Sequence, residues 1–439
     1  MSFRAVVAIY NLILPVAIVL AAPGYFLKMM RRGGFAKDFG QRFGIYSPRA
    51  KRDLFLDPPI WIHAVSVGEV FLAHKLIRSL RRQAPEVPIV LSCTTSTGYA
   101  LAQKNAHLGY TAIYNPIDLQ GPIRRAFLQI QPRLIVLIEA EIWPNLLWRA
   151  KSEGVPVVLA NARLSPRSER RFRKFGALTK PMFSELERVL AQSQLDKERI
   201  EGLGIEREKI LVTGSIKFDQ DGLPDASAQV AEFRQLLGRL RPGEEGAVIL
   251  GGSTHPGEEK FIGEVFLKLK AKCPNAFLVV VPRHAERAAE VAGDLRELSL
   301  APLLKTELNG EIPATNEQTC LIVNTTGELR AWYYLASVVL IGKSFLAEGG
   351  QNPVEPLAAR KPVIMGPNMQ NFSEFVERMV GAGACIQLSQ SAQLEDSLIR
   401  LVENDESREA LIKNVDEVLG PDQGAADRSA NLILEEISR

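Results

Sequence analysis

Short apolar runs that alternate with helical patterns restrict the fold of this sequence more than any other feature. Between Pro59 and Gly214 the strand-like runs are Ile60–Val65, Val87–Ser92, Thr111–Tyr114, Leu134–Ile138, Val155–Ala160, Val189–Ala191 and Ile210–Val212. Several of these runs are almost wholly apolar, which is typical of parallel strands that are covered on both faces. Helical patterns such as 121–130 lie between them. The alternation predicts a doubly wound parallel sheet.

A second series of the same kind follows a polar, turn-rich stretch at 218–225, which we interpret as a linker. Its strand-like runs are Ala247–Leu250, Ala276–Val281, Cys320–Val323, Val338–Ile341 and Pro362–Met365. A chain of 439 residues has room for two to three domains of roughly 150 residues each. We therefore predict an α/β protein with two Rossmann-like domains facing a cleft, at 31–217 and 218–422. We expect the last helix, 423–439, to pack back on the first domain.

The first thirty residues differ from the rest of the chain. Ala5 to Leu27 carries no charge and is about long enough to cross a hydrocarbon core of roughly 30 Å. Lys28, Arg31 and Arg32 follow at once. By the positive-inside rule, 1–30 is a single membrane anchor and the domains lie on the cytoplasmic side of the inner membrane. A cleaved signal peptide is the rival interpretation, and Asn11, Pro15 and Pro23 leave a shallow or re-entrant anchor open.

The net charge and the positions of the cysteines bear on whether the protein binds nucleic acid or a metal. The net charge of +3 is small and argues against a nucleic-acid partner, unless the positive charge is clustered. The four cysteines, Cys93, Cys273, Cys320 and Cys385, are far apart and follow no metal-ligand spacing. They are typical of core residues in a reducing compartment. We expect neither a metal nor a cofactor.

Basic residues crowd one segment that also carries aromatic residues. Its cations are Arg167, Arg170, Arg171, Arg173 and Lys174, and its large apolar residues are Phe172, Phe175, Met182 and Phe183. Such a helix can lie on an anionic membrane or hold an acidic headgroup. A solvated helix face explains the same pattern. The apolar segment upstream favours the membrane interpretation.

Glu69 stands at a strand-to-helix turn. The run from Trp61 breaks at Gly68 and resumes as a helical pattern from Val70. Such a turn lies at the carboxyl edge of a parallel sheet, where open α/β folds bind their ligands. A carboxylate there can serve as a general base. It can equally complement the helix dipole, and spacing alone favours that second interpretation.

The second half of the sequence carries polar loops after its strand-like runs. Ser253, Thr254 and His255 follow one run and precede a helix, an arrangement that favours phosphate but matches no established nucleotide motif. Arg283 follows another run and is suited to a phosphate. Glu355 is suited to ribose hydroxyls. The loop at 253–255 alone is a weak signal. The loops at 281–284, 326–329 and 349–356 each follow an apolar run, and each alone is explained by an ordinary cap or ion pair, whereas three at successive strand ends favour a nucleotide cleft.

The chain as a whole resembles the 3-deoxy-D-manno-octulosonic acid (Kdo) transferases, membrane-anchored GT-B glycosyltransferases of lipopolysaccharide core synthesis. The resemblance runs from the apolar segment to the last helix. Its motifs are WIHAVSVGEV (61–70), TTSTGYA (94–100), EAEIWPN (139–145), ANARLS (160–165), TGSIKFD (213–219), STHPGEE (253–259), VPRH (281–284), TGEL (326–329), GGQNPVEP (349–356) and GPNMQNF (366–372). As an ordered set these motifs are highly specific.

The resemblance implies a reaction: transfer of Kdo from CMP-Kdo to a lipid A precursor, with inversion and without a metal. Glu69 matches the family's general base, and Lys217 matches a lysine near the donor. The positions that match CMP contacts are Pro282, Arg283, Gly327, Glu328, Leu329, Asn352, Pro353, Val354 and Glu355. Further donor or acceptor contacts are Ser253, Thr254, His255, Glu139 and Glu141. The last two bind the acceptor or only shape their loop.

Three residues depart from the family pattern. Gln351 and Asn368 stand where the family usually has His, and Lys343 replaces a Gly. Asn and Gln keep hydrogen bonding but lose a titratable group, so no proton transfer can pass through them. Two other functions stay open at this point. One is another GT-B nucleotide-sugar transferase or an epimerase of similar fold, and the other is a membrane-tethered nucleotide-sugar binding protein that does not need Glu69.

Overall fold

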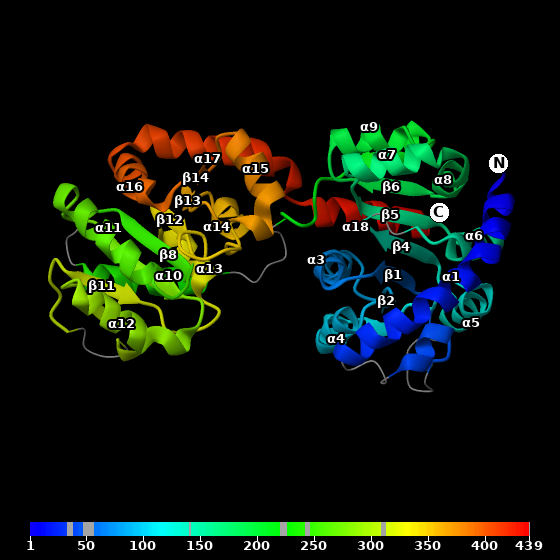
Figure 1. Ribbon diagram of the computed structural model, residues 1–439, viewed down its shortest axis with the longest axis horizontal. Helices are drawn as coiled ribbons and strands as arrows, with labels where there is room; N and C mark the ends of the chain where they lie inside the picture. Colours follow the sequence, from blue (N-terminus) through cyan, green and yellow to red (C-terminus); the bar gives the residue numbers. More distant parts are fainter. Residues whose placement is uncertain are drawn as a thin grey trace. The chain divides into compact units, whose positions relative to one another are not determined.

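The computed structural model describes residues 1–32, 38–46, 57–139, 142–219, 226–241, 246–308 and 313–438. The chain divides into two compact units (Figure 1). Unit 1 is Met1–Gly222 together with Pro421–Arg439, and unit 2 is Leu223–Gly420. The chain therefore leaves unit 1 once and returns to it at its end.

Unit 1 is built on a parallel sheet of seven strands in the order β3-β2-β1-β4-β5-β6-β7. The strands are β1 Ile60–Ala64, β2 Ile89–Cys93, β3 Thr111–Tyr114, β4 Leu134–Ile138, β5 Val157–Ala162, β6 Arg188–Ala191 and β7 Ile210–Val212. The helices between them are α3 Val67–Gln83, α4 Ser96–Lys104, α5 Gln120–Ile130, α6 Pro144–Glu153, α7 Pro166–Lys174, α8 Gly176–Phe183 and α9 Gln194–Glu201. The four central runs β1, β2, β4 and β5 are buried throughout, as their apolar sequences predict.

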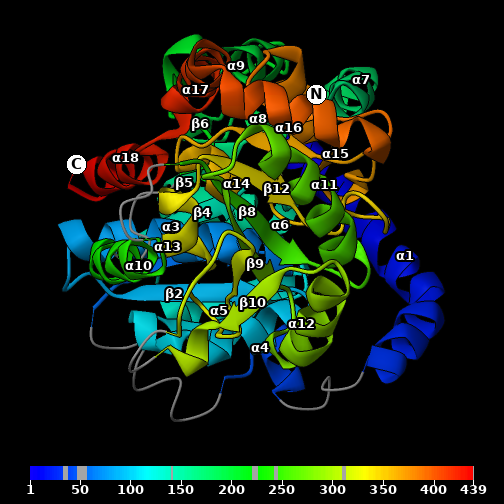
Figure 2. The ribbon, with the colours of Figure 1, turned by 90° about the vertical axis from the view of Figure 1, so that its left-hand side faces the viewer.

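The last helix, α18 (Ala425–Ser438), completes the core of unit 1. It packs against α3, and Figures 1 and 2 show the two helices side by side. Ala426, Ala430 and Ile433 lie in the same apolar cluster as Leu76 of α3. Asp427 of α18 also accepts a hydrogen bond from Ser79. Helix α3, which follows β1, is therefore covered on one face by α18.

The first helix, α1 (Phe3–Arg32), also belongs to unit 1. Its segment Phe3–Leu20 has a mean hydropathy of 2.2 and is long and apolar enough to cross a membrane. Its first turns nevertheless pack against α6 and α8. Length and composition alone are weak evidence for a membrane anchor, because a signal sequence or a core helix has the same properties.

The basic segment forms α7 and α8, and its apolar residues divide between two roles. Phe183 is buried, and Phe172 and Met182 pack against the core of unit 1. Phe175 is half exposed. Three of the four large apolar residues therefore serve the core, and the cations line the outside around them.

Unit 2 is built on a second seven-stranded parallel sheet, in the order β10-β11-β9-β8-β12-β13-β14. The strands are β8 Val248–Thr254, β9 Phe277–Pro282, β10 Ala301–Leu304, β11 Thr319–Ile322, β12 Val338–Ile341, β13 Val363–Met365 and β14 Ile386–Gln387. Its helices are α10 Ser227–Leu240, α11 Glu258–Lys272, α12 Ala288–Glu297, α13 Leu329–Leu335, α14 Val354–Ala358, α15 Ser373–Gly381, α16 Leu394–Glu403 and α17 Asp405–Leu419. Strands β10 and β14 are edge strands that the apolar pattern does not predict, since both are short and only partly buried.

Candidate functional site

The strand order of unit 1 reverses between β1 and β4. From β1 the chain runs outward to β2 and β3, and from β4 it runs outward in the other direction. Open parallel sheets bind ligands at such a switch point, at the carboxyl ends of the strands. Glu69 follows β1 and Glu139 follows β4, and these strands pair directly. The sheet therefore brings the two predicted carboxylates to one point of one edge.

Glu69 lies in the first turn of α3 and is largely buried. Its Oε2 accepts a hydrogen bond from the backbone amide of Val65 at 2.8 Å, and its Oε1 accepts one from the Ser66 hydroxyl at 2.9 Å. Burial raises the pKa of Glu69, against the lowering effect of these hydrogen bonds. Each carboxylate oxygen has a second lone pair. The side chain thus closes the helix start and keeps the capacity to accept a proton.

Glu139 is surrounded by charges of both signs. Burial and the negative charge of Glu69 raise its pKa, and the cations Arg163 and Lys217 oppose that rise. Its backbone is left-handed, with φ of 64°, which is uncommon outside glycine and often marks a functional loop. The structure therefore brings Glu69, Glu139 and Lys217 into one electrostatic neighbourhood. Glu141 lies outside the described residues.

The loop that carries Lys217 is fixed by several long-range contacts. The ammonium of Lys75 in α3 donates to the backbone carbonyls of Lys217 at 2.9 Å and of Asp219 at 2.6 Å. The Asp219 carboxylate accepts from the backbone amide of Ala426 at the start of α18. The Lys217 side chain itself is exposed. The backbone of Lys217 is thus fixed by hydrogen bonds, whereas its side chain stays exposed to solvent.

In unit 2 the strand order reverses between β8 and β12. The loops after these two strands are joined by Glu258, whose side chain is fully buried. Its carboxylate accepts from the backbone amides of His255 at 3.0 Å, Lys343 at 2.6 Å and Phe345 at 3.0 Å. Glu259 beside it is also buried and pairs with Arg287 at 2.7 Å. The two acidic residues of the 253–259 motif therefore hold loops together, a role that their spacing does not reveal.

The predicted residues of the loop after β8 lie at this switch point. Ser253 has a left-handed backbone, with φ of 54°, and the Thr254 hydroxyl donates to Glu259 at 2.9 Å. His255 Nε2 lies 3.0 Å from the side-chain nitrogen of Gln351, which comes from the loop after β12. Burial is the first cause that lowers the pKa of His255. Gln351, one of the three departures, thus bridges the two loops.

The next loops along the sheet carry Arg283 and Glu328. The Arg283 backbone amide donates to Thr254 at 3.0 Å, and its side chain is exposed at the edge after β9. Glu328 is engaged in the loop after β11, because its carboxylate pairs with Lys305 at 3.1 Å and accepts from the Thr325 hydroxyl. Pro282 and Leu329 adjoin these loops, and Gly327 has φ of 84°.

Asn352 closes the start of α14. Its side-chain oxygen accepts from the backbone amide of Val354 at 3.0 Å, and its amide donates to Glu355 at 3.0 Å. Pro353 and Val354 are buried, whereas Glu355 is half-buried and lies near Tyr333, whose pKa its charge helps to raise. Two hydrogen bonds of Asn352 therefore join the end of the loop after β12 to α14, and Glu355 stays partly exposed.

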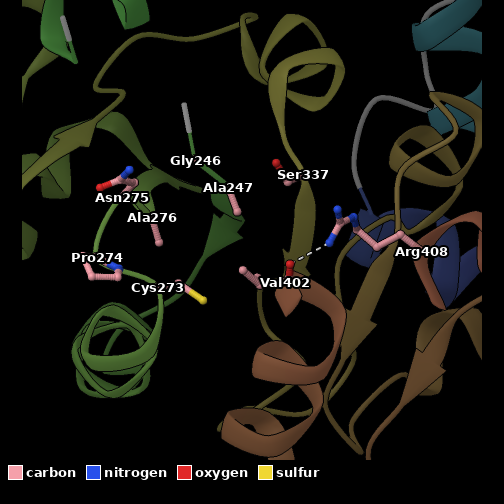
Figure 3. Close-up of a pocket in the computed structure, with 9 residues that line it drawn as sticks. All are labelled: Gly246, Ala247, Cys273, Pro274, Asn275, Ala276, Ser337, Val402 and Arg408. Carbon is pink, nitrogen blue, oxygen red and sulfur yellow. Dashed lines mark hydrogen bonds between the residues drawn. The ribbon is translucent and has the colours of Figure 1, made fainter. Parts of the chain in front are cut away.

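A cavity of about 580 Å³ lies at the opposite edge of unit 2 (Figure 3). It is lined at the amino ends of β8, β9 and β12 by Ala247, Ala276 and Ser337, and farther out by Cys273 and Arg408. Since none of the predicted site residues lines it, this cavity is separate from the candidate nucleotide loops. Among the residues that the structure describes, no group of three or more His, Cys, Asp or Glu side chains is arranged to hold a metal.

The two Rossmann-like units give the chain a GT-B-like fold, and its sequence matches define it as a glycosyltransferase. Residues 315–418 match the group 1 glycosyl transferases, and residues 37–220 match the 3-deoxy-D-manno-octulosonic-acid transferases (kdotransferases). A crystal structure of a protein assigned as a UDP-N-acetylglucosamine 2-epimerase from Listeria monocytogenes has a TM-score of 0.50 and is 12% identical, covering 87% of this chain and 96% of that one. At that identity the likeness shows the fold alone.

Sequence relatives define the family. The 3-deoxy-D-manno-octulosonic acid transferase of Haemophilus influenzae is 33% identical over 408 residues, 92% of each chain. The Bordetella pertussis enzyme of the same description is 32% identical over 405 residues, 89% of this chain and 91% of that one. The chain belongs to the Kdo transferase family, and the expected glycosyltransferase activity is confirmed at that level.

Proposed function

We propose that this Kdo transferase moves Kdo from CMP-Kdo to the glucosamine disaccharide of a lipid A precursor, lipid IVA, with inversion at the anomeric carbon. The observation that supports this most is the pair of carboxylates at the switch point of unit 1. Glu69 is buried with a raised pKa, and its charge acts on Glu139. A carboxyl group tuned in this way suits proton abstraction near neutral pH.

In the proposed step, the acceptor hydroxyl oxygen forms a bond to the anomeric carbon of Kdo. The bond from that carbon to the phosphate oxygen breaks, and its electron pair leaves with CMP. The hydroxyl proton passes to the Glu69 carboxylate, because an alcohol is a poor nucleophile until it is deprotonated. Lys217 and Arg283 stabilise the charge that develops on the departing phosphate.

We assign the donor to unit 2 and the acceptor to unit 1. Arg283 binds the phosphate, and the loop of Gly327, Glu328 and Leu329 lies against the cytosine. Glu355 takes the ribose hydroxyls, positioned by its hydrogen bond from Asn352. Pro282, Pro353 and Val354 shape the loop backbone, and Ser253, Thr254 and His255 complete the donor side. We assign Glu139 to the acceptor side, and Glu141, which lies outside the described residues, is a candidate for the same role from the resemblance alone.

We further propose that the protein works at the inner membrane, with both units in the cytoplasm. The apolar helix α1 and its flanking Lys28, Arg31 and Arg32 support this location. A lipid acceptor also has to be met at a membrane surface. A membrane location agrees with a transferase that has an acylated acceptor better than with an epimerase, whose substrate is a soluble nucleotide-sugar.

A transfer assay tests the proposal. The full-length protein is incubated with CMP-Kdo or a UDP-sugar as donor and with tetraacylated lipid A precursor as acceptor, and products are weighed by mass spectrometry. We expect Kdo transfer from CMP-Kdo only, with the opposite anomeric configuration by NMR. Transfer from a UDP-sugar, or turnover of a UDP-sugar without acceptor, would contradict the donor and favour the transferase or epimerase alternative. The mass increase also counts the Kdo residues added.

A further inference from the structure

The first turns of α1 are part of the core of unit 1. Phe3, Val6 and Val7 are buried in the same apolar cluster as Leu147 of α6 and Phe183 of α8. The Phe3 ring also packs against Trp148 of α6, with ring centroids 5.7 Å apart. Removal of these three apolar side chains from water stabilises the contact. The beginning of α1 is therefore held firmly against unit 1.

Polar contacts continue this docking along the helix. The side-chain amides of Asn11 and Asn145 exchange two hydrogen bonds of 2.8 Å. The side chain of Tyr10, the residue before Asn11, forms a hydrogen bond with the Asp118 carboxylate. Asp118 is itself buried and accepts the backbone amides of Asn145 and Leu146, which begin α6. Asn11, in the charge-free stretch Ala5–Leu27 of α1, thus has a specific partner in unit 1.

The opposite face of α1 is apolar and bare. Leu12, Val16, Val19 and Leu20 are 76%, 60%, 71% and 77% exposed, and no charged residue lies between Arg4 and Lys28. A helix that lies on a protein surface in water normally shows a polar outer face. A continuous apolar face of this kind is typical of contact with another apolar phase. The absence of charge on either side of the helix suits hydrocarbon.

We propose that α1 is a monotopic membrane helix, which lies with its outer face in one leaflet and keeps both ends on the side of unit 1. A helix of 30 residues is about 45 Å long, and a crossing helix places its ends on opposite faces of a hydrocarbon core of roughly 30 Å. Phe3 would then lie across the membrane from unit 1, whereas it packs inside unit 1.

The other end of α1 is tethered to the same unit. Five residues separate Arg32 from Asp38 in the sequence, so these two residues lie at most roughly 20 Å apart. Asp38 accepts a hydrogen bond of 2.8 Å from the Tyr99 hydroxyl of α4. Both ends of α1 are therefore held by unit 1, which one-sided insertion permits and a crossing does not.

The charge around the start of α1 fits a membrane surface. A cavity of about 490 Å³ is lined there by Met1, Arg173, Lys174 and Lys180, together with small residues of α8. Cations that flank an apolar insertion are attracted to anionic headgroups. The basic segment of α7 and α8 thus lies beside the inserted helix, on the headgroup side of the leaflet.

The docking also reaches the catalytic edge of unit 1. Asn145 begins α6, directly after the loop that follows β4 and Glu139, and Asp118 follows β3 at the same sheet edge. The leaflet held by α1 is thereby brought to the edge that carries Glu69. An acylated acceptor can then present its sugar while its chains stay in the leaflet. This inference rests on the membrane attachment proposed above, but on neither the donor nor the catalytic roles.

Labelling from one side of the membrane tests the topology. In a Cys273→Ser background, in which the three remaining cysteines are buried, single cysteines are introduced by Ser2→Cys and, as a reference on the body of unit 2, by Glu264→Cys. An impermeant maleimide is applied to sealed inverted and right-side-out vesicles. We expect both positions to react in the same vesicle type. Reaction of Ser2→Cys only in the opposite type would show a crossing helix and overturn the inference.

A disulfide tests the docking in the same membranes. Asn11→Cys with Asn145→Cys places thiols where the amides meet, and Leu12→Cys with Asn145→Cys is the matched control, because Leu12 faces away. After mild oxidation we expect at least tenfold more linked peptide, by mass spectrometry, for the first pair. Equal yields overturn the docked helix. Recovery of the protein in the soluble fraction overturns the membrane attachment itself, whereas Kdo transfer is scored separately.

Discussion

The two units use an acidic residue at the start of a helix in different ways. In unit 1, Glu69 closes α3 with two hydrogen bonds, and its pKa is raised. In unit 2, Glu258 opens α11, is fully buried, and is occupied by three backbone amides. Both follow the first strand of a parallel sheet, beside its switch point. The two positions at the sheet edge are equivalent, but the Glu258 carboxylate is fully buried and joins two loops, whereas Glu69 keeps some exposure and is bonded only to residues of its own turn. Position at the sheet edge therefore does not by itself assign a role to a carboxylate.

The test with the largest expected effect removes the proposed proton acceptor, Glu69. We expect Glu69→Gln to lower the rate of Kdo transfer by about 10²- to 10⁴-fold, the usual contribution of a general base, while CMP binding stays unchanged by calorimetry. The matched control is Asp196→Asn, because Ser193 and Asp196 close α9 as Ser66 and Glu69 close α3. If both variants lose activity equally, Glu69 acts only as a helix cap.

The equivalent change in unit 2 affects stability. Glu258→Ala leaves three backbone amides without their acceptor, and we expect it to lower the free energy of unfolding by about 3 kcal/mol. Urea unfolding measures this loss. The control, Glu264→Ala on the exposed face of α11, should stay within about 0.5 kcal/mol of wild type. An equally small loss for Glu258→Ala contradicts its role in joining the two loops.

Arg283 tests which unit holds the donor phosphate. We expect Arg283→Ala to weaken CMP binding by about 10- to 100-fold, as the loss of a charge-assisted hydrogen bond does. Calorimetry with CMP measures this change. Arg283→Lys should recover part of the affinity, since it keeps the charge and loses the bidentate geometry. Unchanged binding by the alanine variant would move the phosphate to another cation, such as Lys343.

If Glu69 is the general base, as proposed, its raised pKa sets the pH dependence of transfer. Only the ionised carboxylate accepts a proton, so kcat/KM should fall about tenfold for each pH unit below the pKa of Glu69. Because burial raises that pKa, the acid limb should lie above the range of an ordinary glutamate. A limb in the ordinary range, or the same limb in Glu69→Gln, contradicts this assignment.

The smallest expected effect concerns the acid sensitivity of unit 1. Burial lowers the pKa of His74 to about 4, so the folded state binds its proton less tightly than the unfolded state does. Stability from neutral His74 is present above about pH 6.5 and is lost as the pH falls toward 4. With solvent screening, we expect wild type to lose about 1 kcal/mol more than His74→Gln between pH 7.5 and 5. Equal losses in urea unfolding refute this.

The repeated strands and Glu69 could be predicted because their signals are local. Apolar runs such as Leu134–Ile138 identify buried parallel strands, and a strand, a turn and a helix place Glu69 at a sheet edge. Strand β10 escapes prediction because it contains Pro302 and is only partly buried. The role of Glu258 escapes because two of its three partners lie more than eighty residues away in the chain.

The docked start of α1 escapes prediction for a related reason. A charge-free stretch such as Ala5–Leu27 has the same apolar composition whether it lies in lipid or in a protein core. The residues that the helix contacts decide between these two environments. One of them, Asn145, is 134 residues from Asn11 in the sequence, so no local pattern reveals the contact. The aromatic residues of the basic segment show the same limit, since Phe172 and Phe183 pack inward. Sequence gives the composition of a helix face, and the fold gives its neighbour.

The division of unit 1 between the two ends of the chain has a consequence for biosynthesis. Unit 2, Leu223–Gly420, leaves the ribosome between the body of unit 1 and the segment that includes α18. Translation proceeds at roughly 5 to 20 residues per second, so about 10 to 40 s pass between the synthesis of the body of unit 1 and that of α18, the helix that covers α3. During that interval its apolar surface is open to chaperones. The helix that carries Glu69 is thus covered only after unit 2 and α18 have been synthesised, so a nascent chain cannot acquire a finished unit 1 before unit 2 is made.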